Sequence, residues 1–429
     1  MLDFSMKVAL STLGCKTNQA DSTCIQGALF SNGIEIIPFN EMADVYIINT
    51  CTVTGKTDYQ ARQLIRRALR HASGKATVIV TGCYAQLHHK EIETLGDVIV
   101  FNNTEKDSII NYLIGEHKGD AKKREFCYYS TRSRAYLKVQ DGCNYRCSYC
   151  IVPMARGRSK SISIEDAVRH AKALYYKGYN EIILTGIHIG SYGQDLLPKS
   201  SLIELLTELT NDPAIPRIRI SSLEPNEVND DLISLIETGR VCPHLHIPLQ
   251  SGDDDILTLM NRRYDTSSYR KVISRIVKRV PNICIGTDVI VGFPGETEES
   301  FQRSYRFIEE LPFSYIHVFP FSRRHNTAAA AMDGQVRNNT KGLRAMALRT
   351  LSINKKNIYK QRQLGRFVNV IIEETDNNSM YLKGISENYL EVNIEQSTEK
   401  KGDIITVQIH DLRNGGLSGR EIGNCTTIL

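Results

Sequence analysis

The chain has 429 residues, which is too long for one ordinary hydrophobic core, so two or three domains are expected. With 41% hydrophobic and 24% charged residues, no apolar run long enough to span a bilayer and no signal peptide, the sequence excludes a membrane protein and predicts a cytoplasmic one. Eleven cysteines favour metal or redox chemistry over a disulfide scaffold, and the net charge of +5 permits an acidic partner such as nucleic acid without demanding one.

Strands and helices alternate along the first third of the chain. Strands are expected at 7–12, 44–50, 76–82 and 97–103, and helices at 18–33 and 57–73. Apolar strands that alternate with helices indicate a parallel sheet covered on both faces. The polar, basic stretch 115–125 breaks this pattern and is interpreted as a linker.

Three cysteines occupy matching places in this first region. Cys15, Cys51 and Cys83 each follow a predicted strand directly. Because the carboxyl ends of parallel strands share one edge of a sheet, three thiols so placed can converge on one ligand. A single cysteine of this kind is more often a buried small residue, and a zinc site is a further alternative, although closed zinc sites take four ligands.

The middle of the chain repeats the alternation. Strands are expected at 134–140, 181–186, 217–223, 244–250, 284–293 and 315–321, with helices such as 163–178 and 297–311 between them. Six strand–helix units suit an incomplete TIM-like barrel.

A basic segment follows, and the chain then ends in short strands. Residues 322–366 hold eleven Lys or Arg residues against one acid, Asp333, and 341–365 is predicted to be helical. The segment suits phosphate binding, although a solvated connecting helix explains such a charge run as well. Strands at 366–374, 380–386, 389–395 and 403–412 predict a small all-β barrel.

Three closely spaced cysteines carry the most specific signal. Cys143, Cys147 and Cys150 lie in a loop after the first barrel strand, at the face where barrel enzymes do their chemistry. A four-iron cluster normally takes four thiolates, so three leave one iron open to chelate an amine and a carboxylate, as S-adenosylmethionine offers. Zinc is the weaker alternative, because no fourth cysteine or histidine follows closely in the sequence.

Motifs along nearly the whole chain resemble one family. The cysteine loop resembles that of the radical S-adenosylmethionine enzymes, and "LGCKTNQAD", "NTCTVT", "TGCYAQ", "LTGIHIGSYG" and "GTDVIVGFPGE" resemble their methylthiotransferase branch. The resemblance implies an α/β chain with a parallel N-terminal methylthiotransferase domain at 5–117, a partial (βα)6 radical S-adenosylmethionine barrel at 129–360 and an RNA-binding TRAM β-barrel at 361–429.

The resemblance also implies the cofactors. Two four-iron, four-sulfur clusters with open irons are expected on two sets of cysteines: Cys143, Cys147 and Cys150, and Cys15, Cys51 and Cys83. In this family the first cluster reduces S-adenosylmethionine to a deoxyadenosyl radical, and the second carries the sulfur that becomes the methylthio group. A reducing donor such as flavodoxin or ferredoxin is the expected electron source.

The ends of the other barrel strands are candidates for holding S-adenosylmethionine. The candidates are Thr185, Gly186, Glu224, Gln250 and Ser251. For Glu224 an ordinary turn acid is an equal alternative, and a plain turn explains Gly292 and Gly295 nearly as well as an approach to adenine. Arg262 and Arg263 are interpreted either as partners of a substrate carboxylate or phosphate, or as a solvated helix end.

The branch of the family suggests the substrate. "LGCKTNQ" and the Glu in "SSLEP" resemble enzymes that methylthiolate carbon 2 of N6-threonylcarbamoyladenosine at position 37 of tRNA, with S-adenosylmethionine as radical source and methyl donor. The expected partner is the anticodon stem-loop, contacted by the basic segment and by Lys383, Arg413 and Arg420; neither DNA nor a membrane is expected. Three alternatives stay open: isopentenyl-adenosine in tRNA, a ribosomal-protein aspartate, and an RNA-binding protein with structural metal sites.

Overall fold

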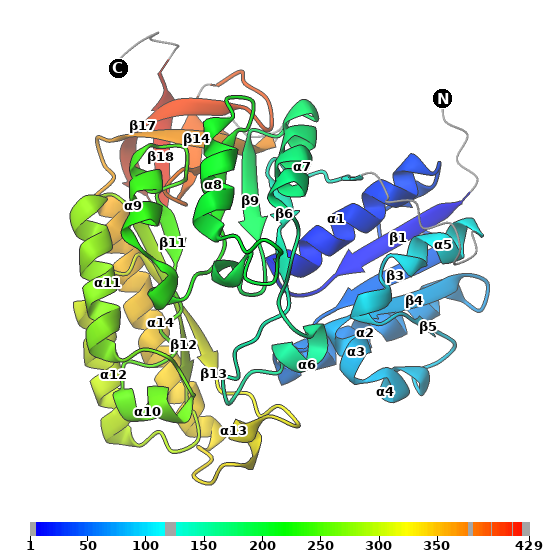
Figure 1. The fold of residues 1–429 in the computed structure, drawn as a ribbon, viewed down its shortest axis with the longest axis horizontal. Coiled ribbons are helices and arrows are strands. Elements are labelled where there is room, and N and C mark those ends of the chain that lie inside the picture. Colours follow the sequence, from blue (N-terminus) through cyan, green and yellow to red (C-terminus); the bar gives the residue numbers. More distant parts are fainter. Residues whose placement is uncertain (1–5, 116–125, 376–380, 396, 414, 423–429) are drawn as a thin grey trace.

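The computed structural model describes residues 6–115, 126–375, 381–395, 397–413 and 415–422. An N-terminal sheet lies beside a larger barrel, and a small C-terminal barrel packs at one end of that larger barrel (Figure 1). The predicted linker, 115–125, lies almost wholly outside the described residues. Within those residues, no helix is long and apolar enough to cross a membrane.

The first region forms a five-stranded sheet in which every pair of neighbours is parallel, in the order β2-β1-β3-β4-β5. Its strands are β1 (Lys7–Thr12), β2 (Glu35–Ile37), β3 (Val45–Thr50), β4 (Thr77–Gly82) and β5 (Ile99–Val100). The predicted parallel sheet is therefore confirmed. The three-residue β2 was not predicted, because a strand this short has no alternating pattern to recognise.

Helices cover both faces of this sheet, and each face has its own apolar core. They are α1 (Lys16–Ser31), α2 (Gly55–Ala72), α3 (Cys83–Leu87), α4 (His89–Glu93) and α5 (Ser108–Ile114). The start of α2 is fixed by a capping box, in which the Thr54 hydroxyl accepts from the Thr57 backbone N–H. α1 has no such side-chain cap; its N-cap residue is Cys15.

The middle of the chain forms the predicted incomplete barrel from two three-stranded parallel sheets, ordered β10-β9-β6 and β11-β12-β13. The strands are β6 (Ala135–Lys138), β9 (Glu181–Thr185), β10 (Arg217–Ile220), β11 (His244–His246), β12 (Cys284–Val291) and β13 (Tyr315–Pro320). β7 (Gln140–Asp141) and β8 (Lys160–Ser161) form a separate short hairpin-like pair that braces the loop after β6.

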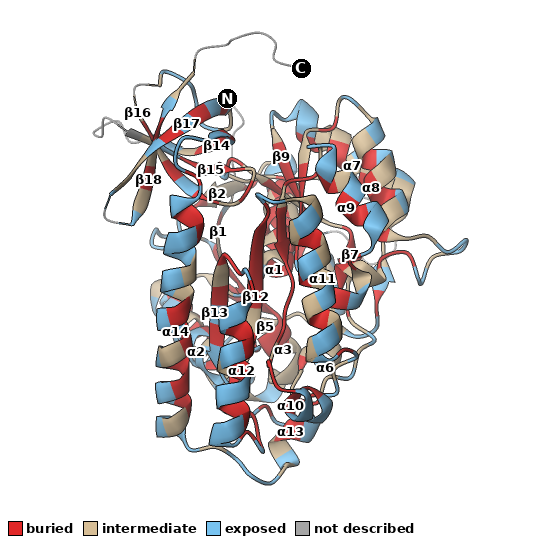
Figure 2. Cartoon of the chain, turned by 90° about the vertical axis from the view of Figure 1, so that its left-hand side faces the viewer, coloured by how far each residue is buried: buried red, intermediate tan, exposed pale blue. Residues whose placement is uncertain are grey.

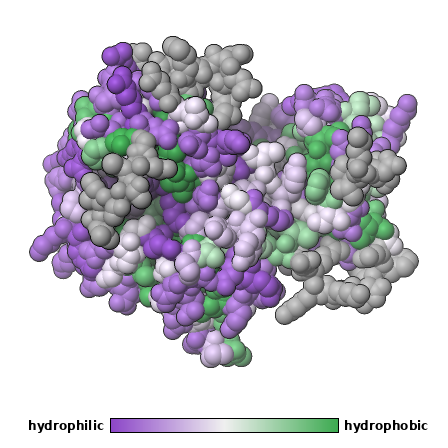
Figure 3. Space-filling view, turned by 90° about the horizontal axis from the view of Figure 1, so that it is seen from above, coloured by the Kyte–Doolittle hydropathy of each residue, from purple (hydrophilic) through white to green (hydrophobic). Residues whose placement is uncertain are grey.

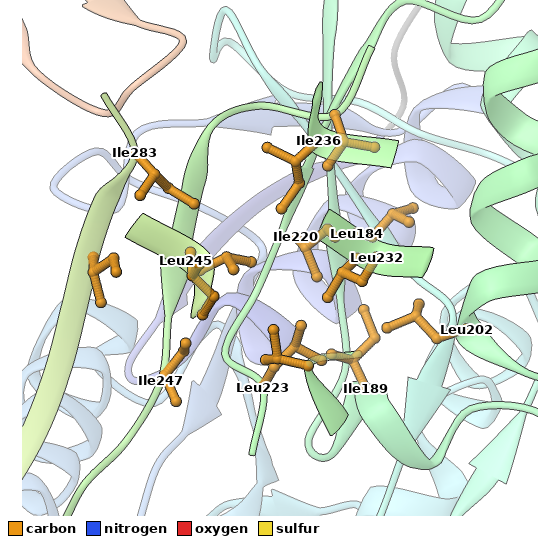
Figure 4. Packing of buried hydrophobic residues seen from close by; sticks show 14 of the residues in the cluster. Leu184, Ile189, Leu202, Ile220, Leu223, Leu232, Ile236, Leu245, Ile247 and Ile283 are labelled. Carbon is orange, nitrogen blue, oxygen red and sulfur yellow. The ribbon is translucent and has the colours of Figure 1, made fainter. Parts of the chain in front are cut away.

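Helices enclose the outside of this barrel, and their apolar faces build the largest core of the molecule (Figure 4). They are α7 (Ile164–Tyr176), α8 (Leu202–Asn211), α9 (Asp230–Glu237), α10 (Asp254–Leu259), α11 (Thr266–Arg279), α12 (Glu298–Glu310) and α14 (Asn338–Gln361). Two short helices lie apart from this core: α6 (Val152–Arg156) packs against α3, and α13 (Ala328–Ala331) joins a separate small cluster. Figure 2 shows buried strands within and helices that bury only one side. Between β6 and β13 the barrel is not closed by strands, and α1 packs against β6 and β9.

The last strands close into a five-stranded barrel in the order β14-β15-β16-β18-β17. They are β14 (Phe367–Thr375), β15 (Tyr381–Ser386), β16 (Glu391–Glu395), β17 (Ile404–Arg413) and β18 (Gly416–Glu421). The predicted all-β tail is confirmed, whereas β18 was missed because its glycines and charges disguise the strand. The small barrel is tied to the large one by Arg217 and Arg219, which donate to backbone carbonyls of 369 and 385–387.

Candidate functional site

The three N-terminal cysteines stand at the carboxyl edge of the parallel sheet. Cys15 caps α1, Cys51 follows β3, and Cys83 begins α3. Gly14 has φ +99°, and a Cβ there would lie only 2.8 Å from the Cys51 sulfur. A side chain at Gly82 would likewise overlap a backbone oxygen of the neighbouring strand. Both glycines are therefore required for the strands to bring the thiols together.

These thiols influence one another electrostatically. Burial raises the pKa of Cys51 to about 11, and the neighbouring Cys83 and Cys15 act in the same direction. All three are free cysteines. Their convergence on one ligand, expected from their places at the strand ends, stays a prediction, which the close approach of Gly14 to Cys51 supports.

The second trio lies in the loop between β7 and α6. Gly142, with φ +70°, turns the chain so closely past Arg158 that no side chain would fit. Burial raises the pKa of Cys150 to about 12 and also raises that of Cys147. This trio has cationic partners in direct contact with two of its sulfurs.

Arg262 and His188 are those partners. One Arg262 nitrogen donates to the Cys147 sulfur at 3.3 Å, and the other pairs with Glu224. The Nδ1 atom of His188 lies 3.6 Å from the Cys143 sulfur. Sequence reasoning missed His188, because it lies far along the chain. A histidine therefore does approach the cysteine loop in the folded protein, although none follows the loop closely in the sequence.

The solvated interpretation of Arg262 is wrong, because its side chain is only 3% exposed. Glu224 begins the short turn Pro225–Glu227, as its alternative has it, but its side chain is only 17% exposed and pairs with Arg262. Arg263, in contrast, is exposed and stacks its guanidinium 4.0 Å from the centroid of the Tyr145 ring. Arg262 is therefore a buried partner of Glu224 and Arg263 an exposed partner of Tyr145, a difference that the sequence did not reveal.

A cavity of about 200 Å³ lies between the cysteine loop and the segment that follows Cys51, and of the six cysteines Cys150 lines it. Its walls come from the cysteine loop, from the segment after Cys51 and from the ends of β11, β12 and β13: Val53, Thr54, Tyr149, Cys150, Ile151, Val152, Gln250, Asp288, Ile290, Phe319, Pro320, Phe321, Ser322 and Arg324. Most of these are apolar, as in pockets that exclude water around a reaction.

Arg156 joins the two regions. It follows the second trio, yet its charge is held by Asp21 of α1 at 3.3 Å and Asp141 at 2.8 Å, and Cys83 and Cys15 lie among the groups that act on it. Lys138 also pairs with Asp21, and Arg324 pairs with Asp58 of α2 at 2.6 Å. The N-terminal sheet is thus fastened to the barrel by buried ion pairs.

The spacing of the sulfurs tests what each trio can hold. A zinc ion sits about 2.3 Å from its thiolates, which places their sulfurs less than about 4 Å apart. In the described part of the chain, neither trio has all three sulfurs within 4.8 Å of one another. A four-iron cluster attaches each thiolate to a different iron and does not require the three sulfurs to lie this close together.

The remaining candidate residues lie around these trios. Thr185 is buried, and its hydroxyl lies 3.5 Å from that of Thr17 in α1, while Gly186 packs against Gln140. Gln250 lines the cavity with φ +67°, a backbone conformation that is uncommon outside glycine, and Ser251 beside it is buried.

Gly292 and Gly295 behave as turn residues. The Gly292 N–H donates to the Glu296 carboxylate, and a Cβ at Gly292 would overlap the Lys341 side chain. Gly295 has φ +84°, and a Cβ built on it would meet the Leu259 side chain at 3.2 Å. Neither glycine lines the cavity, so the plain-turn alternative fits them.

Much of the basic segment serves the fold. Arg344 pairs with Glu296 and Glu298, and Lys341, Lys355 and Lys360 donate to backbone carbonyls. The exposed cations are Arg323, Arg337, Arg349, Lys356, Arg362 and Arg366. Lys383, Arg413 and Arg420 are also exposed, although Arg413 and Arg420 pair with Asp411 and Glu395. Seen over the small barrel, the surface is mainly hydrophilic with scattered apolar residues (Figure 3).

Two further groups were not predicted. His246 and His317 both contact Asp288, at 2.9 and 3.2 Å, in an arrangement that could hold a metal ion. Burial lowers the pKa of Lys16 to about 8, and the guanidiniums of Arg219 and Arg134 add to this effect. Only the folded chain brings these side chains from several strands together.

Comparison with protein-family models gives two matches. Residues 137–308 match the Radical SAM superfamily, and residues 7–102 match the Uncharacterized protein family UPF0004. The chain is 37% identical to threonylcarbamoyladenosine tRNA methylthiotransferase MtaB of Aquifex aeolicus, over 94% of this chain and 100% of that protein. The MtaB protein of Bacillus subtilis is 38% identical, over 94% and 93%.

The chain belongs to the radical S-adenosylmethionine methylthiotransferase family. This methylthiotransferase is also 30% identical to tRNA-2-methylthio-N(6)-dimethylallyladenosine synthase of Clostridium botulinum, over 96% of each chain. Membership of the radical S-adenosylmethionine enzymes implies a four-iron cluster and S-adenosylmethionine.

Solved structures agree with the fold. The radical S-adenosylmethionine methyltransferase TsrM of Kitasatospora setae has a TM-score of 0.58 at 14% identity, over 76% of this chain and 77% of that one. The radical enzyme OxsB has a TM-score of 0.50 at 10% identity, over 84% and 57%. At these identities the likeness shows the α/β architecture alone.

Proposed function

We propose that this methylthiotransferase places a methylthio group on carbon 2 of N6-threonylcarbamoyladenosine at position 37 of tRNA, with S-adenosylmethionine as radical source and methyl donor. The observation that carries the proposal is an apolar cavity bordered by the cysteine loop and by the segment after Cys51. The substrate rests on the relatives: those named for threonylcarbamoyladenosine are 37% and 38% identical, against 30% for the dimethylallyladenosine enzyme.

Two four-iron clusters fit the two trios. Cys143, Cys147 and Cys150 would hold one, and Cys15, Cys51 and Cys83 the other. When bound, the clusters supply the electron that generates the radical and the sulfur that is transferred. The protein itself positions the reactants and excludes water with its apolar cavity walls.

S-adenosylmethionine is proposed to bind along the barrel strand ends. Gln250 supports this role because it lines the cavity beside Cys150. Thr185, Gly186 and Ser251 are neighbours at the same end, whereas the Glu224 carboxylate is already paired with Arg262 and so acts through that pair. Arg262 in turn holds the Cys147 sulfur and orients the loop.

The anticodon stem-loop is the proposed RNA partner, with the small β-barrel as a TRAM domain. Support comes from exposed cations on α14 and on the small barrel, which would contact phosphates. Flavodoxin or ferredoxin is the proposed electron donor.

Nucleoside analysis tests this function. tRNA from a deletion strain should lack the methylthio form of threonylcarbamoyladenosine and regain it when the gene is restored. Loss of methylthio-isopentenyl-adenosine instead would show the other tRNA substrate. Unchanged tRNA together with an unmodified ribosomal-protein aspartate would show the protein substrate. No change in either would leave an RNA-binding protein with structural metal.

A further inference from the structure

Lys16 reaches from the N-terminal domain toward the interior of the barrel. It directly follows Cys15 and is the first residue of α1. Its Nζ atom lies 6.0 Å from the centroid of the Tyr389 ring in the small barrel. The charges that act on it belong to Arg219, Arg134, Glu181 and Asp288, all on barrel strands or next to one. The ammonium therefore lies where all three parts of the molecule meet.

The acids near this ammonium already have other partners. Glu181 pairs with Arg134, Arg217 and Arg219, at 3.6, 2.7 and 2.8 Å. Asp288 accepts from two histidines. Among the residues that the structure describes, none forms an ion pair or hydrogen bond with the Lys16 ammonium. A partly buried cation without a partner, surrounded by other cations, is a place for an anionic ligand.

A second polar group beside it is also unsatisfied. His244 is 1% exposed, and its Nδ1 atom has no hydrogen-bond partner in the described structure. Its ring stacks 4.2 Å from the Tyr389 ring, the same ring that the Lys16 ammonium faces, so His244 and Lys16 share a neighbour. Buried polar atoms are normally paired, and an orphan nitrogen next to an unpaired ammonium indicates room for a polar ligand.

The chemistry of adenine connects Lys16 with the transferred sulfur. C2 and the N6 substituent lie on the same edge of the ring, on either side of N1. A trio of thiols that serves sulfur transfer to C2 must face this edge. Cys15 belongs to that trio and Lys16 is the next residue, so in this arrangement the N6 group would lie on the same side of the site as the lysine. A threonylcarbamoyl group ends in a carboxylate, to which an ammonium can donate up to three hydrogen bonds.

We propose that Lys16 binds the carboxylate on the N6 substituent and thereby determines the preference for a carboxylated adenosine over one with an apolar substituent. This inference rests on the proposed function and adds the residue that reads the substrate. Asp288 connects the lysine to the reaction chamber, because it acts on Lys16 and also lines the cavity next to Gln250.

The proposal is tested by combining substitutions of Lys16 in the enzyme with changes of the N6 group in the substrate. Reconstituted wild-type, Lys16→Gln and Lys16→Arg enzymes are compared on three anticodon stem-loops that carry threonylcarbamoyl, its methyl ester or isopentenyl at N6. Binding is measured as a dissociation constant under anaerobic conditions, and methylthio product by mass spectrometry. Lys75→Gln is the matched control, because Lys75 is exposed after α2 at the opposite edge of the sheet.

Wild type should bind the carboxylated loop about tenfold to a hundredfold more tightly than its ester, as expected for a charged hydrogen bond. Lys16→Gln should bind both equally and keep its affinity for the isopentenyl loop, and Lys16→Arg should keep part of the discrimination. Iron content equal to that of Lys75→Gln shows that the neighbouring thiols still hold their cluster.

The proposal is overturned if Lys16→Gln discriminates the acid from the ester as wild type does. It is also overturned if wild type does not distinguish them, a result that needs no variant to fold. Failure of the proposed function looks different: wild type then forms no methylthio product on the threonylcarbamoyl loop, whatever its affinities.

Discussion

Cys143, Cys147 and Cys150 come from one short loop, whereas Cys15, Cys51 and Cys83 come from the ends of three strands that are far apart in the sequence. The thiols of the loop trio are placed by one segment, although their cationic partners, Arg262 and His188, come from distant parts of the sequence. The strand trio depends on a folded sheet and on its docking against the barrel. Local structure therefore positions the first set of thiols, and the tertiary structure positions the second.

The largest effect should separate the two trios by function. Cys51→Ala and Cys147→Ala should each lower the iron content by about four atoms per chain and abolish methylthio transfer. Only Cys147→Ala should abolish the cleavage of S-adenosylmethionine to deoxyadenosine. Iron analysis and chromatography of deoxyadenosine check this. Equal loss of deoxyadenosine in both variants would refute the division of roles.

Arg262 tests whether the loop trio depends on its own partners. Arg262→Gln leaves Glu224 buried without its partner and should lower the free energy of unfolding by about 3–5 kcal/mol. Denaturant unfolding of the apoprotein measures this loss. Arg263→Gln is the matched control, because Arg263 is exposed, and should change stability by less than about 0.5 kcal/mol. Similar losses in both would contradict the different burial of the two arginines.

Acid should weaken the docking on which the strand trio depends. Burial alone would raise the pKa of Asp21, but Lys138, Lys106 and Arg156 outweigh it and hold the pKa well below the ordinary 3.8. Because the pKa of Asp21 is lower in the folded protein than in the unfolded chain, its ionised carboxylate stabilises the fold at pH values above 3.8. This stabilisation is lost as the pH falls toward the pKa of Asp21 in the folded protein. Asp21→Asn should therefore cost about 2–3 kcal/mol near pH 7, and the difference from wild type should shrink below pH 3.8.

Denaturant unfolding of the apoprotein at several pH values measures the Asp21 effect. Asp44, an exposed acid in the same sheet, gives the control Asp44→Asn. A difference that grows on acidification would show that Asp21 does not act through its ionised form.

The smallest effect should leave both trios untouched. Lys356→Gln and Arg362→Gln remove exposed cations of α14 and its end. Each should reduce the salt dependence of stem-loop binding by about one unit of slope, without changing iron content. Filter binding at several salt concentrations checks this, and an unchanged slope would remove α14 from the RNA surface.

The sequence predicted those parts of the molecule that local patterns encode. Strand ends located Cys15, Cys51 and Cys83, and alternation predicted the sheet and the barrel. The pairs Arg156–Asp21, Arg324–Asp58 and Arg262–Glu224 were beyond prediction, because each joins side chains far apart in the chain. The same holds for Lys16, whose surroundings come from strands that only the fold assembles. The basic segment was predicted to bind phosphates, but part of it is buried. Charge alone does not distinguish the buried Arg344 from the exposed cations.

The guanidiniums of Arg217 and Arg219 donate to backbone carbonyls of the small barrel, and that of Arg219 also lies over the Tyr389 ring. These contacts hold the small barrel against one end of the large one. On the proposed function, an RNA bound to the small barrel would then meet the cavity at a set distance, and a nucleotide one position nearer or farther along the RNA would not reach it.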